Sequence, residues 1–158
     1  RLEMYNNLFE PKPTRCFILL GHNDSKLTSG SGFTESVVKP EDYKTQLVEF
    51  IGKVKEQSGA SFTLLSPTSS VYEITKANAD KAVAAGRGAS LFGKPEVMAQ
   101  FAELTQQVAT ATGSGYVDVL TPTRDFPNKP TLFTADGVHL SLDGNHLLAL
   151  ALLKHLAK

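Results

Sequence analysis

Residues 15–25 read Arg-Cys-Phe-Ile-Leu-Leu-Gly-His-Asn-Asp-Ser. The first six form a short apolar run, which is typical of a buried strand in a parallel sheet. Gly21 and the polar residues behind it end that strand. Two more strand-like runs follow at residues 61–65 and 116–120. Because helical patterns separate the three runs, the order predicts strands joined by helical crossovers.

Three helices are predicted between and after these strands. Pro40 opens the first, which ends before Gly59, and Pro95 opens the second, which ends at Gly113. The third covers residues 141–157 and is apolar almost all round, so we expect a sheet or a neighbour to cover it well. The pattern βαβαβα predicts an α/β fold, with a parallel sheet between two layers of helices.

The remaining segments are predicted to be connections. Residues 22–38 are rich in Ser, Gly and Thr, and residues 121–138 are rich in Pro, so both are interpreted as loops. Residues 73–94 have a helical composition at first and then several glycines, which favours a surface insertion. With 158 residues and 17.0 kDa, the chain is the size of one domain.

Composition excludes several classes of function. Sixteen basic residues balance sixteen acidic ones, which gives no support to nucleic-acid binding. No apolar run approaches the roughly 20 residues of a membrane-spanning helix. Cys16 is the single cysteine and the four histidines are scattered, so neither a disulfide framework nor a metal site is expected. One cysteine fits a reducing compartment such as the cytoplasm.

Two polar clusters lie at the carboxyl ends of predicted strands, where ligands bind in open α/β sheets. Asp136 and His139 are three residues apart, so the carboxylate can receive one imidazole N–H and leave the other nitrogen free as a base. The amide of Asn23 can stabilise an oxyanion, and Gly21 allows close backbone approach. A base, its orienting carboxylate and an oxyanion donor are the machinery of acyl transfer without the nucleophile.

Each of these signals also has a purely structural interpretation. Asp136-Gly137 is an ordinary turn sequence, and Ser141 is a plausible N-cap for the last helix. Asn23-Asp24 can be turn residues. His22 lies between Gly21 and Asn23, and its position suits a pocket-lining role and a loop role equally. The other two histidines, at 146 and 155, are expected to pack or to reach solvent.

The same residues carry a resemblance to a known family. Gly21-His22-Asn23-Asp24 resembles the third signature block of the SGNH (GDSL) hydrolases, Gly-x-Asn-Asp, and Asp136-Gly137-Val138-His139 resembles their fifth block, Asp-x-x-His. Within that superfamily the chain is most similar to the isoamyl acetate-hydrolysing esterases. The matching features are Asn23-Asp24-Ser25, the Pro40 to Tyr43 helix start, Ser66-Pro67, the segment from Asp136 to Gly144, and an insertion at 73–94.

The resemblance implies a flavodoxin-like fold and a cofactor-free serine ester hydrolase. His139 would be the general base, Asp136 its orienting residue, and Asn23 an oxyanion donor, with Gly21, His22 and Asp24 as possible pocket residues. Small acetate esters of alcohols are the implied substrates. Acetylated carbohydrates, or a non-catalytic interaction module that has lost its nucleophile, are the alternatives.

The family's first two blocks, including the Gly-Asp-Ser of the nucleophile, have no counterpart here. Residues 1–158 are therefore expected to be one incomplete domain, without its first two strands and inactive alone. We expect a preceding segment, a companion chain or a partner in a homodimer to supply the serine and to cover the exposed edge of strand 15–20. Four serines of this chain, none in a nucleophile turn, are not assigned that role: Ser66, Ser69, Ser70 and Ser90.

Overall fold

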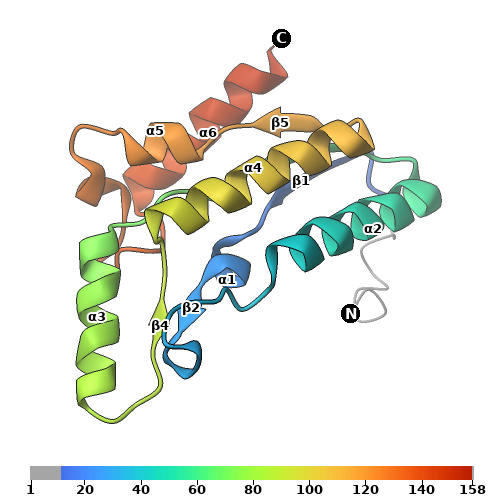
Figure 1. Ribbon diagram of the computed structural model, residues 1–158. Helices are drawn as coiled ribbons and strands as arrows, with labels where there is room; N and C mark the ends of the chain where they lie inside the picture. Colours follow the sequence, from blue (N-terminus) through green and yellow to red (C-terminus); the bar gives the residue numbers. More distant parts are fainter. Residues whose placement is uncertain (1–11, 158) are drawn as a thin grey trace.

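The computed structural model describes residues 12–157 (Figure 1). Its larger elements alternate strand and helix, as the sequence predicts. The elements in chain order are β1 (Arg15–Leu19), α1 (His22–Ser25), β2 (Leu27–Thr28), the 3₁₀ turn η2 (Ser29–Ser31), α2 (Pro40–Ser58), β3 (Ser61–Leu65), α3 (Tyr72–Ala84), β4 (Ser90–Leu91), α4 (Pro95–Thr112), β5 (Gly115–Val117), α5 (Leu120–Arg124), the 3₁₀ turn η3 (Lys129–Leu132) and α6 (Leu142–Leu156).

The main sheet has the order β1-β3-β5, with both pairs parallel. Arg15 is in register with Ser61, and Leu65 of the central strand faces both Leu19 and Val117. Parallel strands with this register end together, so the loops after β1, β3 and β5 leave the sheet at one edge. Ligand sites form at this carboxyl edge in α/β folds.

Helices cover the two faces of the sheet separately (Figure 1). On one face, α2 and α4 run side by side and bury the largest apolar cluster, which includes Ile51, Leu64 and Phe101, each fully buried. Tyr43 Oη and Thr105 Oγ1 lie 3.0 Å apart and join these two helices. On the other face, α6 packs through its inner side against Leu65, Val117 and Val119.

The two proline-initiated helices have the ends that the sequence predicts. Pro40 and Pro95 occupy the first turns, where a missing N–H costs nothing, and acidic residues follow each proline. Gly59 and Gly113 end the helices in the left-handed conformation that favours glycine.

The last helix is less covered than expected. Its inner side contacts the sheet, but the leucines on its outer side are exposed, with fractions from 45% to 71%, at Leu142, Leu150, Leu153 and Leu156. A helix touches a flat sheet along only one face, so a helix that is apolar all round leaves its opposite face open. Within the described residues, no element covers that outer face.

The first strand also has an open side. No strand of residues 12–157 pairs with the edge of β1 that faces away from β3. Phe17 and Leu19 are 43% and 39% exposed. The unpaired apolar edge that the sequence predicts for this strand is therefore present.

Three connecting segments are more ordered than predicted. The segment 22–38 contains α1, β2 and η2, and the segment 121–138 contains α5 and η3. The predicted surface insertion, 73–94, is only partly a surface feature, because Ala79 and Leu91 are buried with Leu27 in a cluster of their own. The cause is the antiparallel pairing of β4 with β2, a two-residue contact that leaves no periodicity in the sequence.

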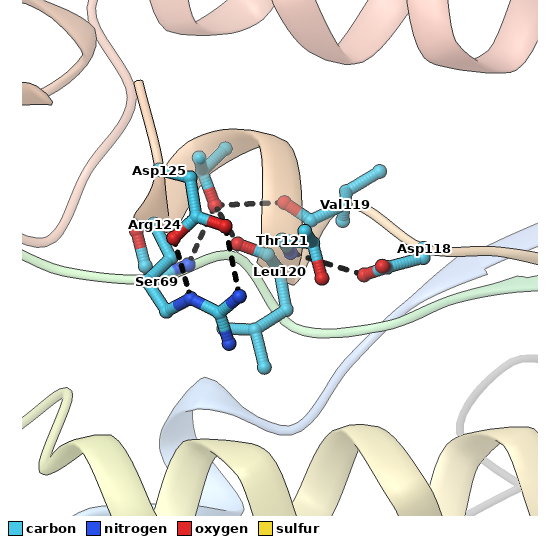
Figure 2. Close-up of polar contacts among 8 residues, drawn as sticks. Ser69, Asp118, Val119, Leu120, Thr121, Arg124 and Asp125 are labelled. Carbon is cyan, nitrogen blue, oxygen red and sulfur yellow. Dashed lines mark hydrogen bonds and ion pairs between the residues drawn. The ribbon is translucent and has the colours of Figure 1, made fainter. Parts of the chain in front are cut away.

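The third strand ends earlier than predicted, at Val117 rather than residue 120. The hydroxyl of Ser66 accepts hydrogen bonds from the backbone N–H groups of Val119 and Leu120, each 2.9 Å long, and so turns the chain into α5. Asp118 accepts a hydrogen bond from Thr121 N, in the first turn of this short helix, at 3.1 Å (Figure 2).

No helix among residues 12–157 combines the length and the apolar character needed to cross a bilayer.

Gly144 controls how closely α6 packs on the rest of the molecule. It is the one buried residue of that helix, and a Cβ there would collide with the backbone carbonyl of Leu132. We expect Gly144→Ala to lower the free energy of unfolding by about 1–3 kcal/mol, because backbone cannot move aside as a side chain can. Urea denaturation followed by circular dichroism measures this change.

Gly52→Ala is the matched control, since Gly52 is exposed in α2 and a Cβ there meets no atom within 4 Å. It should raise stability by about 0.5–1 kcal/mol through helix propensity alone. Equal effects of the two substitutions would contradict the packing role of Gly144.

Candidate active site

The first of two polar loops at the carboxyl edge of the sheet follows β1. Gly21 adopts a φ of 114°, and its carbonyl accepts a hydrogen bond from Ser25 N at 2.8 Å, which closes α1. A Cβ at this position would lie 3.2 Å from Pro67 Cγ in the loop after β3. Glycine therefore satisfies both the backbone conformation and the close contact between the two loops.

The second loop precedes α6 and contains Asp136 and His139. Oδ2 of Asp136 lies 2.5 Å from Nδ1 of His139. Its other oxygen accepts hydrogen bonds from the backbone N–H groups of Val138 and His139 and from the hydroxyl of Thr134, at 2.8, 3.0 and 2.8 Å. Because Nδ1 is occupied, Nε2 is the nitrogen of His139 that remains available to a reacting group.

These hydrogen bonds control the charge of Asp136. Partial desolvation opposes ionisation, but the bonds from His139, Val138 and Thr134 outweigh it and hold the pKa of Asp136 well below its usual range. The carboxylate is thus ionised at any pH near neutrality, so it can both orient the His139 ring and stabilise its protonated form.

A pocket of about 440 Å³ joins the two loops. Four of the residues singled out in the sequence line it, namely His22, Asn23, Asp136 and His139. Of the other two predicted pocket residues, Gly21 and Asp24, neither is among the lining residues. Gly21 acts through its backbone conformation, and the carbonyl of Asp24 accepts a hydrogen bond from Val38 N.

His22 lies against the pocket wall rather than in solvent. Its Nε2 is 2.9 Å from Thr68 Oγ1, and its Nδ1 is buried without a hydrogen-bond partner. Burial lowers the pKa of His22, the nearby His139 lowers it further, and hydrogen bonding to Thr68 opposes this shift. A neutral imidazole therefore ties the loop that bears Asn23 to the loop after β3.

Sequence reasoning missed one wall of the pocket. Among the lining residues that were not predicted, five form this wall: Thr68, Thr75, Asn78, Ser90 and Phe92. All but Thr68 belong to the segment interpreted as a surface insertion. The helical composition of 73–85 predicted α3, but the sequence carries no signal for the β2–β4 pairing that places this segment beside the sheet.

The serines considered as substitute nucleophiles lie in different environments. Ser66 Oγ is fully buried and engaged with backbone N–H groups, while Ser69 and Ser70 line a separate small cavity. Ser90 lines the pocket that contains His139. Of the four serines, it is therefore the one that shares a cavity with the histidine.

The other polar candidates lie away from the pocket. His146 is exposed on α6, and Cys16 packs against the main apolar cluster, where burial raises its pKa. Across residues 12–157, no group of three or more histidine, cysteine or acidic side chains is arranged to hold a metal ion.

Known structures share this architecture. A lipase/acylhydrolase from Enterococcus faecalis has a TM-score of 0.72 at 15% identity, and the match covers 97% of this chain and 66% of that one. An acetylxylan esterase, Axe2, from Geobacillus stearothermophilus has a TM-score of 0.67 at 19% identity, with 98% and 64% covered. A candidate SGNH hydrolase from Slackia heliotrinireducens has a TM-score of 0.66 at 18% identity, with 98% and 72% covered.

The chain has the SGNH hydrolase fold. It spans 66% of the Enterococcus structure and 64% of the acetylxylan esterase. No protein-family model and no curated protein sequence matches it. At these identities the likeness concerns the fold, and the chemistry has to be argued from the pocket.

The low pKa of Asp136 can be tested directly. Side-chain carboxyl ¹³C NMR should show Asp136 titrating below the ordinary value of about 3.9, and His139→Ala should raise that pKa by removing one hydrogen bond. Because the native pKa is lower than the unfolded one, the carboxylate stabilises the fold above about pH 4, and this contribution disappears as the pH falls through the native pKa.

His146→Ala is the control, because His146 is exposed on α6 and outside the pocket lining. If Asp136 has the same pKa in the wild type, His139→Ala and His146→Ala, then His139 does not lower the pKa of that carboxyl group.

Proposed function

We propose that this chain carries the base, orienting and oxyanion parts of a serine ester hydrolase site. The contact between Asp136 Oδ2 and His139 Nδ1 supports the proposal most strongly, because it leaves Nε2 of the histidine free to act as a base. Both residues also line the same pocket as Asn23. In the proposed reaction, His139 Nε2 takes the proton of an attacking serine hydroxyl. Asp136 stabilises the imidazolium that forms, and the Asn23 amide donates to the oxyanion.

Short acyl esters of small alcohols are the proposed substrates. The lining of the pocket combines four apolar residues with eight polar ones, and its apolar part suits an ester with a small hydrocarbon group. The apolar contribution comes from Leu19, Phe92, Val138 and Leu140. Hydrolysis through this site requires no cofactor, because a proton relay and hydrogen-bond donors suffice for acyl transfer.

A carbohydrate O-acetylesterase is a second candidate function. The wall formed by α3 and β4 places Asn78 and Ser90, both exposed, at the pocket, so it offers an amide and a hydroxyl. These groups can hydrogen-bond to the hydroxyls of a sugar. The acetylxylan esterase from Geobacillus stearothermophilus has the same fold. Comparing an acetylated xylo-oligosaccharide with an alkyl acetate distinguishes the two substrates by their kcat/KM ratio.

We further propose that the nucleophilic serine belongs to a polypeptide segment outside residues 1–158. Ser66 is engaged in backbone hydrogen bonds, and Ser69 and Ser70 face another cavity. Ser90 lies on a two-residue strand, not in the sharp strand-to-helix turn that exposes a nucleophile. The open edge of β1 offers a place for such a segment to pair. The serine could come from one of three sources: a further segment of the same protein, a companion chain, or a second copy in a homodimer.

Substituting His139 tests the proposed base. In the protein assembled with its serine-bearing segment, His139→Ala should lower kcat on p-nitrophenyl acetate by about 10³-fold or more, because no other group would accept the serine proton. Initial rates against the spontaneous hydrolysis of the ester measure this. His146→Ala should keep nearly full activity, and a similar loss in both variants would contradict the assignment.

The position of the nucleophile makes a separate prediction. Residues 1–158 alone should hydrolyse p-nitrophenyl acetate at close to the background rate and should not react with a fluorophosphonate probe. Intact mass spectrometry and peptide mapping locate any adduct. Labelling of Ser90, together with loss of activity in Ser90→Ala, would place the nucleophile within this chain. A longer form that shows no activity and no labelling would favour a non-catalytic interaction module.

A further inference from the structure

A second, smaller cavity lies between the start of α4, the turn η3 and α5. Its volume is about 40 Å³, and its lining shares no residue with the pocket at His139. The lining combines two hydroxyls with two cations and apolar atoms, from Ser69, Ser70, Met98, Leu120, Arg124 and Lys129. A cavity needs a volume of roughly 10–15 Å³ to hold one water molecule, so this cavity admits an occupant of a few heavy atoms.

The two hydroxyls have no hydrogen-bond partner within residues 12–157. Ser69 and Ser70 are 4% and 1% exposed, and neither Oγ makes a hydrogen bond. Their backbone is held in place, because Ser69 N donates to Thr123 Oγ1 at 2.9 Å and Gly93 packs directly against Ser70. A buried hydroxyl without a partner costs about 1–3 kcal/mol, so two in one cavity point to an occupant that accepts from them.

The two cations at the cavity differ in their charge balance. Figure 2 shows the Arg124 guanidinium engaged by Asp125, with contacts of 2.7 and 2.8 Å. Lys129 forms no ion pair with any carboxylate of residues 12–157. Desolvation lowers its pKa, Glu73 and Asp125 attract its charge from a greater distance, and Arg124 repels it. The cavity lining thus includes a partly buried lysine whose positive charge no ion pair among residues 12–157 balances.

We propose that this cavity binds a small oxyanion, with Ser69 Oγ and Ser70 Oγ donating hydrogen bonds to its oxygens and Lys129 balancing its charge. A carboxylate or an inorganic phosphate has the required chemistry. Water can accept hydrogen bonds from the hydroxyls but carries no charge to balance that of Lys129, whereas an anion does both. The inference stands apart from the proposed esterase activity, because no residue of this cavity belongs to the pocket at His139.

Amide NMR titration of the protein at constant ionic strength tests the proposal. Sodium acetate and sodium phosphate are added in separate series, with sodium chloride as the reference salt. We expect saturable shifts of the Ser69, Ser70 and Gly93 amides with at least one of the two oxyanions. Acetate can also enter the pocket at His139, and the Asn23 amide reports on that event separately.

Two variants and one control decide the outcome. Ser70→Ala and Lys129→Met should each weaken binding roughly tenfold, because each removes a hydrogen bond to a charged group. Ser70→Ala removes an unpaired buried hydroxyl, so without oxyanion its melting temperature should equal or exceed that of the wild type. Lys53→Met, which removes the same charge from the exposed side of α2, should leave binding unchanged.

Saturation by acetate alone identifies a carboxylate as the occupant, and saturation by phosphate alone identifies phosphate. Shifts that do not saturate with either anion show that the cavity holds only water and overturn the proposal. Equal binding by the wild type and Lys129→Met overturns it as well.

Discussion

The parallel pairing of β3 with both of its neighbours is the constraint from which the site follows. Parallel strands in register end at the same edge, so the loops after β1, β3 and β5 meet there. That arrangement brings the Gly21 turn against Pro67 and lets Ser66 hold the start of α5. Antiparallel pairing would send neighbouring loops to opposite edges and leave Asn23 and His22 without the walls of their pocket.

The two halves of the proposed site depend on the fold to different degrees. Asp136 holds His139 through contacts between residues at most three positions apart, so this pair is organised by its own loop. Asn23 reaches the same pocket because the loop after β1 and the loop before α6 both border it. His22 adds a tertiary link through Thr68, 46 residues away in sequence. The proposed base is thus held by local structure, whereas the proposed oxyanion donor is positioned by the sheet.

The exposed apolar groups lie on two surfaces of the described residues. One is the face of β1 that bears Phe17 and Leu19, and the other is the outer side of α6. Apolar surface in such continuous runs is unusual on an isolated domain and is typical of surfaces that associate. The sheet face at β1 continues into the pocket, since Leu19 belongs to both. A segment that paired with β1 would therefore lie next to this pocket, which is where the proposed mechanism needs a serine.

The sequence by itself determined the order of β1, β3, β5 and the helices α2, α4 and α6, the proline and glycine ends of α2 and α4, and the Asp136–His139 pair. All of these depend on periodicity or on neighbours within one turn, which a linear sequence displays. Only the tertiary structure decided that β4 pairs with β2 and turns a predicted surface insertion into a pocket wall. It also decided that α6 is half exposed and that Ser69, Ser70 and Lys129 share a cavity. Each of these features depends on which residues, distant in sequence, come into contact in the fold. Such contacts involve only one or two residues at a time, so they produce no periodic pattern in the sequence.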